Sequence, residues 1–360
     1  MLFLSARRVA AMSGQVWGND MGATISDVAK KAGVGLATVS RALNGVGYVS
    51  PDTRERILKA ASELKYRHNR LASGLAAGRT KLIGVLAAPD LISTFRSTIG
   101  PIEIAIREAG YSMLLYTSTE SSEGERICLE QLMQNRVAGV AAFPGSTLKH
   151  PGIYRELLDS GIKLVVIGWH FKRLPTLQIR SNDYEITYKA TQHLLSLGHK
   201  RIVYLSMPLS AIAGEEREKG FRDALKEAGV PKELSPTIEI EFSEESAAAA
   251  VSQLMKFKNP PTAIIARHDM IARGVMRKLA SLGLSIPGDV SIVGTGDIPD
   301  NDMLFTPLTT VRLPILQMAQ TGIQRLLSFL AGETVKTENI VMDVELIVRA
   351  STAPPRCVAI

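Results

Sequence analysis

The stretch T-I-S-D-V-A-K-K-A-G-V-G-L-A-T-V-S-R-A-L-N, residues 24–44, decides how this chain begins to fold. Thr24 and Asp27, three residues apart, predict a capping box that starts a short helix. The apolar residues that follow recur at helical spacing, at Ile25, Val28, Ala29 and Ala32. Gly33 ends this helix, and a second one is predicted from Leu36 to Leu43. The stretch therefore predicts a helix, a glycine turn and a second helix, which is helix-turn-helix geometry.

A third helix is predicted directly downstream. Ser50-Pro51-Asp52 supplies an N-cap, an N1 proline and a first-turn acid, so the helix is expected to run from there to about Leu64. Its buried face is predicted to consist of Ile57, Leu58, Ala61 and Leu64. Residues 24–64 thus predict a small three-helix bundle.

The second helix is expected to present a DNA-binding face, made of the residues that its packing does not use: Leu36, Ala37, Ser40 and Arg41. Thr38 and Ser40 can donate to phosphate oxygens, and Arg41 can make two hydrogen bonds to a guanine edge. Four further cations could contact phosphates, namely Lys30, Lys31, Arg54 and Arg56. The alternative is an ordinary three-helix bundle with a solvated basic face.

The distribution of charge favours the DNA-binding interpretation. The 360-residue chain has a formal net charge of +7, with 12 Lys and Arg against 5 Asp and Glu in residues 1–80 and 30 of each in residues 81–360. A basic segment on a neutral body is typical of a polyanion partner.

Cys128 and Cys357 are far apart, and no apolar run reaches the roughly 18 residues of a membrane span. A disulfide-rich, zinc-binding or membrane-spanning protein is therefore disfavoured.

From Lys81 onward, strand-like apolar runs alternate with amphipathic helices. Strands are predicted at 82–87, 111–116, 162–167 and 201–205, and glycines end the intervening helices at Gly110, Gly161, Gly198, Gly229 and Gly283. Strands without polar alternation indicate parallel sheets buried on both faces, and about ten of them favour two α/β lobes over one sheet.

The first 22 residues lack a secretory pattern. We expect them either to be disordered or not to be translated, in which case the true start is Met12 or Met21 rather than Met1.

The quoted stretch resembles the DNA-binding domain of the lactose/galactose-repressor (LacI) family. The resemblance continues through V-S-P-D-T-R-E-R-I-L at 49–58, L-K-Y-R-H-N-R-L-A at 64–72, L-I-G-V-L at 82–86 and R-V-A-G-V at 136–140. It also includes L-G-H at 197–199, G-F-R-D-A-L at 220–225, S-I-V-G at 291–294 and T-P-L-T-T-V at 306–311. The resemblance implies a cytoplasmic homodimeric repressor that reads palindromic double-stranded operator DNA. It also implies a body similar to periplasmic sugar-binding proteins, with a small-molecule effector in the cleft between its lobes.

The implied domain limits follow the same blocks. An N-terminal extension at 1–22 precedes a helix-turn-helix domain at 23–68, a hinge helix or linker at 69–80 and a two-lobed effector-binding and dimerisation body at 81–351. The first lobe is expected to comprise about 81–180 and 311–333, and the second about 181–308 and 334–351.

The resemblance also implies particular DNA-binding positions. The head contributes Thr24, Leu36, Ala37, Thr38, Ser40, Arg41 and Asn44. The hinge contributes Asn69, Arg70, Ala72 and Leu75, with Leu75 at the position of the leucine that wedges into the central base step and kinks the duplex. The alternative for Leu75 is a simple linker residue. Gly74 disfavours a stable hinge helix, which suits a segment that orders on DNA.

The implied effector site lies at the carboxyl ends of strands. Its expected residues are Phe95, Trp169, Arg217, Phe242, His268, Asp269 and Asp297. Arg217 matches an arginine that grips ligand hydroxyl or carboxylate groups, the alternative being a surface salt bridge. Phe95 and Phe242 match positions that often hold an aromatic residue against the ligand, although either could be core packing.

Four departures from the family pattern bear on the effector. G-F-D-D is replaced by Gly294-Thr295-Gly296-Asp297, so that the first acid becomes Gly296, and N-D is replaced by His268-Asp269. The chain has Gly168 where an acid is frequent, and Arg180-Ser181-Asn182 where V-D-N is usual. Losing acids while gaining His268 and Arg180 favours an anionic effector, such as a sugar acid or a sugar phosphate, over a neutral sugar.

Two other classes of protein were weighed. An enzyme is disfavoured, because Gly294-Thr295-Gly296 is not a phosphate loop and no nucleophile elbow or zinc-protease motif occurs. A solute-binding transport protein with a basic N-terminal head would suit the body but not the head. We expect no cofactor and no metal.

Overall fold

The computed structural model describes residues 23–44, 47–66, 80–88, 95–119, 121–145, 151–209, 211 and 213–356, except the side chains of residues 44, 95 and 96. The chain divides into two compact units, residues 1–80 and residues 81–360. We call them the head and the body and describe each by itself.

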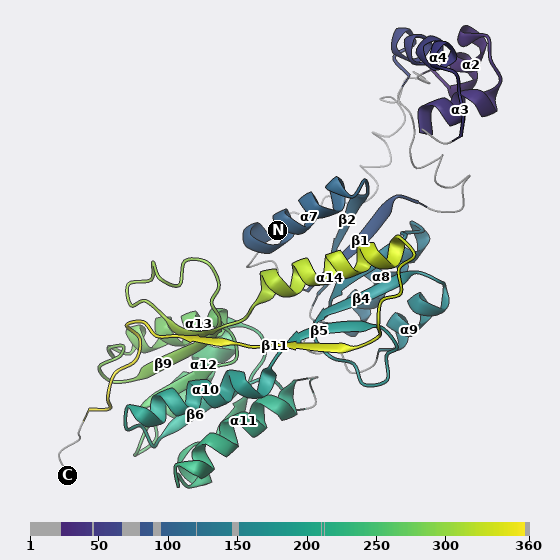
Figure 1. Ribbon diagram of the computed structural model, residues 1–360. Coiled ribbons are helices and arrows are strands. Elements are labelled where there is room, and N and C mark those ends of the chain that lie inside the picture. The colour runs from purple at the N-terminus through teal and green to yellow at the C-terminus, as the bar shows by residue number, and fades with distance from the viewer. Residues whose placement is uncertain are drawn as a thin grey trace, which may run out of the picture. The chain divides into compact units, whose positions relative to one another are not determined.

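The head contains the three predicted helices, α2 (Ile25–Ala32), α3 (Leu36–Asn44) and α4 (Pro51–Glu63) (Figure 1). The capping box at the start of α2 is confirmed, because the Thr24 side chain accepts from the Asp27 backbone and the Asp27 carboxylate accepts from Thr24 N at 2.8 Å. Gly33 ends α2 with φ at 65°, a left-handed conformation that a side chain would strain. The helix, glycine turn and helix of the prediction are therefore confirmed.

A small core holds the three helices together, made of Val28, Ala29, Ala32, Val39, Ala42, Ile57, Ala60 and Ala61. One predicted core residue is wrong, because the Leu58 side chain is 51% exposed. On α4 the inward positions are Ile57, Ala60 and Ala61, spaced at i, i+3 and i+4. Leu58 lies about 100° around the helix from Ile57 and so falls beside this face.

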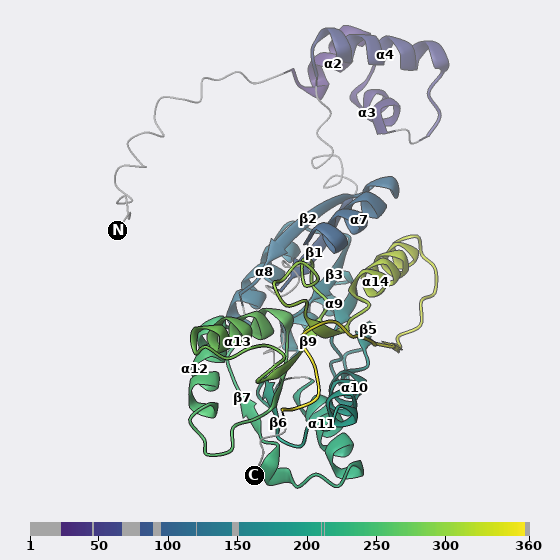
Figure 2. The same ribbon diagram turned by 90° about the vertical axis from the view of Figure 1, so that its left-hand side faces the viewer.

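The first lobe of the body is a six-stranded, all-parallel sheet. Its strands in spatial order are β11 (Asn339–Met342), β5 (Leu177–Ser181), β4 (Lys163–Gly168), β3 (Gly139–Phe143), β1 (Leu82–Ala87) and β2 (Ser112–Thr117). Helices α7 (Phe95–Glu108) and α14 (Ile315–Leu330) pack on one face, and α8 (Ser122–Gln134) and α9 (Gly152–Asp159) on the other. Figure 2 shows this layered lobe from the side.

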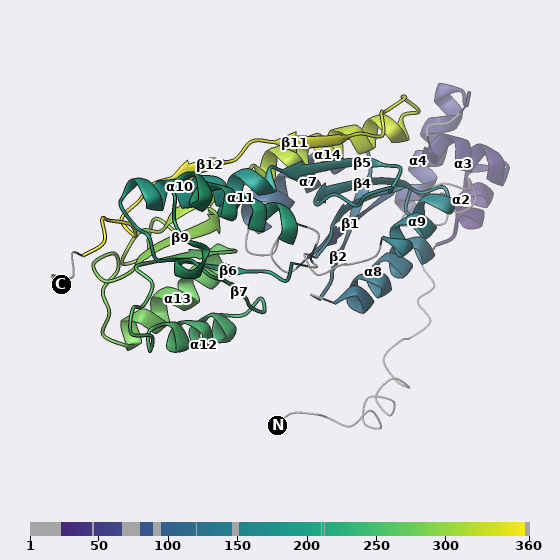
Figure 3. The ribbon, with the colours of Figure 1, turned by 90° about the horizontal axis from the view of Figure 1, so that it is seen from below.

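The second lobe repeats this plan with one antiparallel edge strand, β12 (Glu345–Ile347). The other strands, in spatial order from β12, are β10 (Thr309–Arg312), β9 (Ser291–Gly296), β8 (Ala263–Ala266), β6 (Ile202–Ser206) and β7 (Thr237–Glu239). Figure 3 shows the sheet between two helix pairs. One pair is α10 (Asp183–Ser196) and α11 (Gly214–Glu227), and the other is α12 (Glu244–Leu254) and α13 (Asp269–Ser281), with a short 3-10 helix at Lys232–Leu234.

The two-lobed α/β prediction is thus confirmed. The described residues form twelve strands rather than about ten, and the four predicted strands agree to within one residue at each end. The five glycines predicted to end helices all have φ between 66° and 95°. Among the described helices, none is long and apolar enough to cross a membrane.

Sheet pairing corrects the expected limits of the lobes. The chain passes between them three times, from β5 to α10, from β10 to α14 and from β11 to β12. β11, expected in the second lobe, pairs with β5 of the first, and all of β10 pairs with β9 of the second. Strands of only four residues, as β10 and β11 are, carry too little periodicity to reveal their partners from sequence.

Candidate functional site

The outward face of α3 is the first candidate site. Leu36 is 52% exposed, and Ala37 and Arg41 are also exposed, whereas Val39 and Ala42 are buried. Thr38 and Ser40 are half-buried. The helix therefore presents the predicted residues on a side that its own packing does not use. Their contacts with DNA stay predictions.

Contacts from neighbouring segments fix α3 in the head. The guanidinium of Arg54 donates to the carbonyl oxygen of Ala42 at 2.8 Å, which satisfies the carboxyl end of the helix. A Cβ at Gly47 would lie 3.3 Å from Cδ of Arg41, and φ of Gly47 is 75°. Because residue 47 is a glycine, no side chain there crowds Arg41 in its position on the outward face of α3.

Not every predicted DNA contact has a free group. Thr24 uses its hydroxyl in the capping box, and Lys31 pairs with Glu63 at 2.7 Å. Arg54 is committed to Ala42, whereas Lys30 and Arg56 are exposed. The side chain of Asn44 and all of Asn69, Arg70, Ala72 and Leu75 lie outside the described residues, so the hinge contacts stay predictions.

The second candidate site is a cavity between the lobes of the body. It holds about 800 Å³ of space not filled by protein atoms, part of it open to solvent. The first lobe contributes residues at the carboxyl ends of its strands, including Phe143, Gly168, Trp169 and Ser181. The second lobe contributes Met207, Arg217, Phe242, Arg267, His268 and Thr295. The predicted position at strand ends is confirmed as the position of a cavity, and its occupant stays a prediction.

Arg217 is not a surface residue, since it is only 4% exposed. Its Nε donates to the Asp183 carboxylate at 2.8 Å and its Nη1 to the Arg267 carbonyl at 3.3 Å. Although burial acts to lower it, the negative charge of Asp183 keeps the pKa of Arg217 above its ordinary value. The surface salt bridge weighed for this residue is therefore wrong. Arg217 is a charged, fixed donor at the wall of the cavity.

Phe242, Arg267 and His268 form one packed group on the same wall. The Arg267 guanidinium lies 5.1 Å from the centre of the Phe242 ring, and His268 meets that ring edge-on at 5.1 Å. Arg267 itself is 5% exposed and also donates to the carbonyl of Ile240 at 3.5 Å. This arrangement offers a ligand an aromatic ring with hydrogen-bond donors beside it.

His268 is not the cation that the sequence suggested. Burial of its ring, with a smaller effect of the guanidiniums of Arg267 and Arg217, lowers the pKa of His268 to about 3. Nδ1 accepts from Met270 N at 3.2 Å and caps α13, so the proton of the neutral ring is on Nε2. His268 can therefore only act as a neutral donor toward the cavity.

Trp169 joins the two lobes. It follows β4 of the first lobe and packs against Met207, Ala211 and Ala213 of the second. Its Nε1 donates to the Pro144 carbonyl at 2.7 Å, and the Arg217 guanidinium lies 5.8 Å from its ring centre. The indole is therefore held in one orientation between the lobes.

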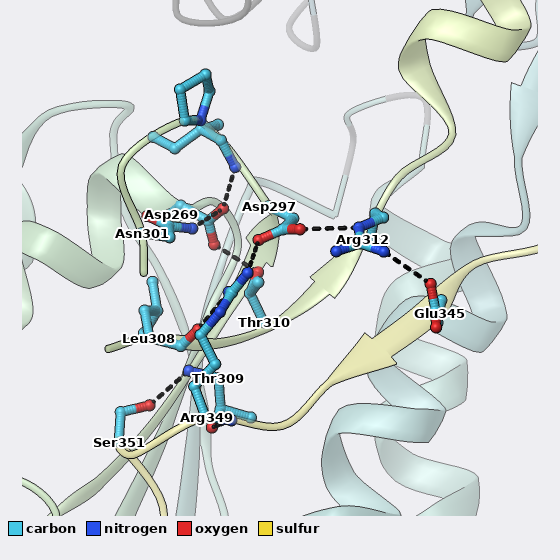
Figure 4. A network of polar contacts seen from close by, with 12 residues as sticks. Asp269, Asp297, Asn301, Leu308, Thr309, Thr310, Arg312, Glu345, Arg349 and Ser351 are labelled. Atoms are coloured by element: carbon cyan, nitrogen blue, oxygen red, sulfur yellow. Dashed lines mark hydrogen bonds and ion pairs between the residues drawn. The ribbon is translucent and has the colours of Figure 1, made fainter. Parts of the chain in front are cut away.

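Asp269 and Asp297 do not belong to this cavity as the structure describes it. Asp269 is fully buried and accepts from Ile298 N, Asn301 Nδ2 and Thr310 Oγ1 at 2.6–2.9 Å. Asp297 pairs with Arg312 and Arg349, each at 2.8 Å, as Figure 4 shows. Both carboxylates fix the loop after β9. Neither is among the described residues that line the cavity, and their contact with an effector stays a prediction.

The neighbouring departures from the family pattern have structural reasons. At Gly296, which replaces the first acid, φ is 129° and an added Cβ would lie 3.3 Å from Oδ2 of Asp269, so a side chain there would be strained. Arg180 is absent from the described lining and forms ion pairs with Glu216 and Asp183 at 2.5 and 3.8 Å. Nothing can be said of the Phe95 side chain, which lies outside the described residues.

Several residues of the cavity were not predicted from the sequence, including Arg267, Ser181, Met207 and Phe143. Each is the last residue of a strand or the first after it. A position at the end of a predicted strand was therefore the signal that could have identified these residues. Deciding which strand ends line the cavity requires the order of the strands in each sheet.

The body and the head together define a class of protein, a DNA-binding regulator with a two-lobed body of ligand-binding type. Residues 24–69 match the model of bacterial regulatory proteins of the lacI family, and residues 191–352 match that of a periplasmic binding protein-like domain. The chain is 34% identical to the transcriptional regulator DegA of Bacillus subtilis, covering 93% of this chain and 99% of that protein. It is 30% identical to the HTH-type transcriptional repressor PurR of Mannheimia succiniciproducens, covering 91% of this chain and 98% of that protein.

Solved structures agree with these relatives. The Lac repressor dimer bound to operator and the anti-inducer ONPF matches with a TM-score of 0.79 and 28% identity, over 92% of this chain and 99% of that one. A regulator of Enterococcus faecium with bound ribose matches with a TM-score of 0.68 and 27% identity, over 76% and 100%. The chain therefore belongs to the lacI family of bacterial regulatory proteins, which are DNA-binding transcriptional regulators.

Proposed function

We propose that the protein is a homodimeric transcriptional repressor in the cytoplasm, and that a small carbohydrate-like effector with an acidic group sets its affinity for a palindromic operator. The observation that carries this proposal is the cavity lined by residues of both lobes. A ligand that contacts both lobes binds more tightly to one arrangement of them than to another. Such differential affinity is what couples a ligand to DNA binding.

The head supports the DNA-reading part of the proposal. The exposed side of α3 combines Arg41, which suits a guanine edge, with Leu36 and Ala37, which can only make apolar contacts such as those with a thymine methyl. A helix of this kind is not needed in a solute-binding transport protein. The match of residues 24–69 to a regulatory family also disfavours a transport protein as the alternative function.

The lining of the cavity supports an acidic effector. The described lining residues include two arginines, the neutral His268 and no Asp or Glu. Aromatic rings at Trp169 and Phe242 suit the apolar face of a sugar ring, and guanidinium groups suit a carboxylate or a phosphate. A sugar acid or a sugar phosphate fits this combination better than a neutral sugar.

An exposed apolar loop supports the homodimer. In the loop after β9, Met303 is 79% exposed and Phe305 is fully exposed. Large apolar side chains that are exposed in one short loop are typical of a protein interface. We infer that a second copy covers them. Met303→Ser with Phe305→Ser should then yield monomers in light scattering at a concentration where Phe257→Ser, a control on another 59% exposed phenylalanine, stays dimeric. If the double variant stayed dimeric, the dimer interface would have to lie on another surface of the protein.

The function is tested in two steps. Selection of bound duplexes from a random-sequence library should return a palindrome, to which the purified protein binds more tightly than to a scrambled duplex. Sugars, sugar acids and sugar phosphates are then titrated into the complex while fluorescence anisotropy reports operator binding. A compound that binds the protein without changing operator affinity would contradict the control function. A reporter gene whose transcription falls on removal of the protein would contradict repression.

A further inference from the structure

The acidic side chain of Glu125 is buried in the first lobe, next to a segment that lines the cavity. Glu125 lies in the first turn of α8 and is only 1% exposed, whereas Glu123 and Arg126 of the same helix form an exposed ion pair. Burying a carboxyl group destabilises the folded state unless hydrogen bonds compensate for the lost water. The groups that donate to Glu125 therefore indicate what its burial achieves.

The first donor to Glu125 belongs to the peptide group between Pro144 and Gly145, directly after β3. Its N–H, that of Gly145, donates to Oε2 of Glu125 at 3.2 Å. Its carbonyl oxygen, that of Pro144, accepts from Nε1 of Trp169 at 2.7 Å. Because a trans peptide group is planar, its N–H and C=O point in opposite directions. Glu125 and Trp169 are therefore bonded to the two ends of one rigid unit, and Glu125 sets the direction of the acceptor that holds the indole.

The second donor to Glu125 is the hydroxyl group of Tyr154 on α9, which binds Oε1. Burial and the negative charge of Glu125 raise the pKa of Tyr154 well above its ordinary value, so the phenol keeps its proton and donates. The Tyr154 ring packs on Phe171, two residues after Trp169, with 5.3 Å between the ring centres. The side chain of Gln178 accepts from Phe171 N at 2.7 Å and donates to Phe171 O at 3.1 Å. This second route therefore ends on the same segment as the first.

Trp169 is the residue at which both routes meet. Its indole lines the cavity and packs against Met207, Ala211 and Ala213 of the second lobe. A ring on a side chain with two rotatable bonds contacts a ligand productively only when packing and hydrogen bonds fix its rotamer. The bond to Pro144 supplies that restraint, and Glu125 fixes the peptide group that provides it.

We propose that Glu125 is a positioning residue that fixes Trp169 in the orientation in which the indole meets the effector and the second lobe. It acts through the peptide group after Pro144 and through the ring of Tyr154. Glu125 itself is not among the residues that line the cavity, so it acts on a ligand through Trp169. The inference rests on the proposed function where it concerns the effector, and on the contacts within the first lobe where it concerns Trp169.

The first experiment reads the environment of Trp169 without any ligand. The chain has two tryptophans, so Trp17→Phe leaves Trp169 as the single fluorescent indole of the full-length protein. In this parent, Glu125→Ala should shift the emission to longer wavelength and increase quenching by acrylamide, because the released indole becomes accessible to water. Glu125→Gln should stay closer to the parent, since an amide oxygen can accept from Gly145 N and an amide nitrogen can donate to the Tyr154 hydroxyl.

Glu123→Ala is the matched control, because Glu123 lies in the same turn of α8 and its side chain is 65% exposed. It should leave the emission of Trp169 unchanged. Tyr154→Phe keeps the ring and removes one donor, so it should move the emission in the same direction as Glu125→Ala but by less. Parent emission and quenching in both Glu125→Ala and Tyr154→Phe would overturn the proposal, even with a lower melting temperature, because Glu125 would then act on stability alone. If Glu125→Ala does not fold, Tyr154→Phe decides by the same criterion.

The second experiment measures effector binding to the same variants by calorimetry. The probes are glucuronate, gluconate, glucose 6-phosphate and glucose. The probe that binds the parent most tightly should bind Glu125→Ala about tenfold more weakly, as expected for the loss of a hydrogen bond to a charged group, and should bind Glu123→Ala equally well. Unchanged affinity together with a shifted Trp169 emission would show that the effector does not need Trp169 in place, and would overturn the positioning role. If no probe bound the parent, the proposed class of effector would be rejected, while the fluorescence would still decide the role of Glu125.

Discussion

The buried ion pair between Asp183 and Arg217 gives the sharpest stability prediction. Asp183 begins α10 and Arg217 lies in the first turns of α11, and their side chains are 3% and 5% exposed. Asp183→Asn removes the charge but keeps an oxygen that can accept from Nε at 2.8 Å. Breaking a buried pair on one side costs about 3–5 kcal/mol, and we expect the lower end, about 3 kcal/mol, because this hydrogen bond survives.

The measurement is thermal unfolding of the full-length protein. A loss of about 3 kcal/mol corresponds to a fall of roughly 6–12 °C in Tm for a domain of this size. Glu216→Gln is the matched control, because it breaks the neighbouring pair with Arg180, whose glutamate side chain is 48% exposed. That change should cost less than about 1 kcal/mol, as surface pairs do.

A second variant separates the charge of this pair from its packing. If the cost comes from leaving Arg217 charged and buried alone, then Asp183→Asn combined with Arg217→Met should be more stable than Asp183→Asn by itself. Equal melting temperatures of Asp183→Asn and Glu216→Gln would refute the claim that burial makes this pair important. If Asp183→Asn with Arg217→Met were less stable than either Asp183→Asn or Arg217→Met alone, the desolvation argument would be refuted.

Four further outcomes are expected. Arg41→Ala should weaken operator binding by about 1–3 kcal/mol and relax base preference, and unchanged discrimination in a gel-shift assay would remove Arg41 from base reading. Leu75→Ala should reduce DNA bending, and an unaltered bend angle would count against the predicted wedge. Gly294→Ala should destabilise the body by about 1–3 kcal/mol in urea unfolding, because its Cβ would lie 2.1 Å from Oδ1 of Asp269, and a neutral result would show that the Asp269 side chain can move aside. Hydrogen bonds from the backbone and side chain of Thr24 hold the pKa of Asp27 below its ordinary value. The ionised Asp27 carboxylate therefore stabilises the head fully above that ordinary pKa, and this stabilisation is lost as the pH falls through the folded-state pKa. An equal loss of stability at pH 3 in the wild type and in Asp27→Asn would contradict this role of the carboxylate.

The head was predictable because its signals are local. The capping box at Thr24, the turn at Gly33 and the proline at Pro51 each act within a few residues of their own position. Only Leu58 was misplaced, and the error is one step around a helix whose alanines form most of its inner face.

The cavity was less predictable because its members come from distant strands. Trp169, Arg217, Phe242 and His268 were expected there from the family resemblance, and they do line it. Asp269 was expected for the same reason, yet its partners Ile298, Asn301 and Thr310 are 29–41 residues away in sequence. These partners hold the carboxylate away from the described cavity lining, and sequence does not show them.

The anchoring of one crossover indicates where the lobes can move relative to each other. Arg312, the last residue of β10, is tied within the second lobe to Asp297 at 2.8 Å and to Glu345 at 3.0 Å (Figure 4). Leu313 and Ile315, which follow it, line the cavity, and Ile315 begins α14 of the first lobe. The ion pairs fix the chain up to Arg312, and the helix fixes it from Ile315 onward. A change in the angle between the lobes must therefore be taken up by Leu313 and Pro314 at this crossover, next to the cavity. A ligand that contacts Leu313 and Ile315 therefore touches the segment at which a change of lobe angle has to change the backbone angles.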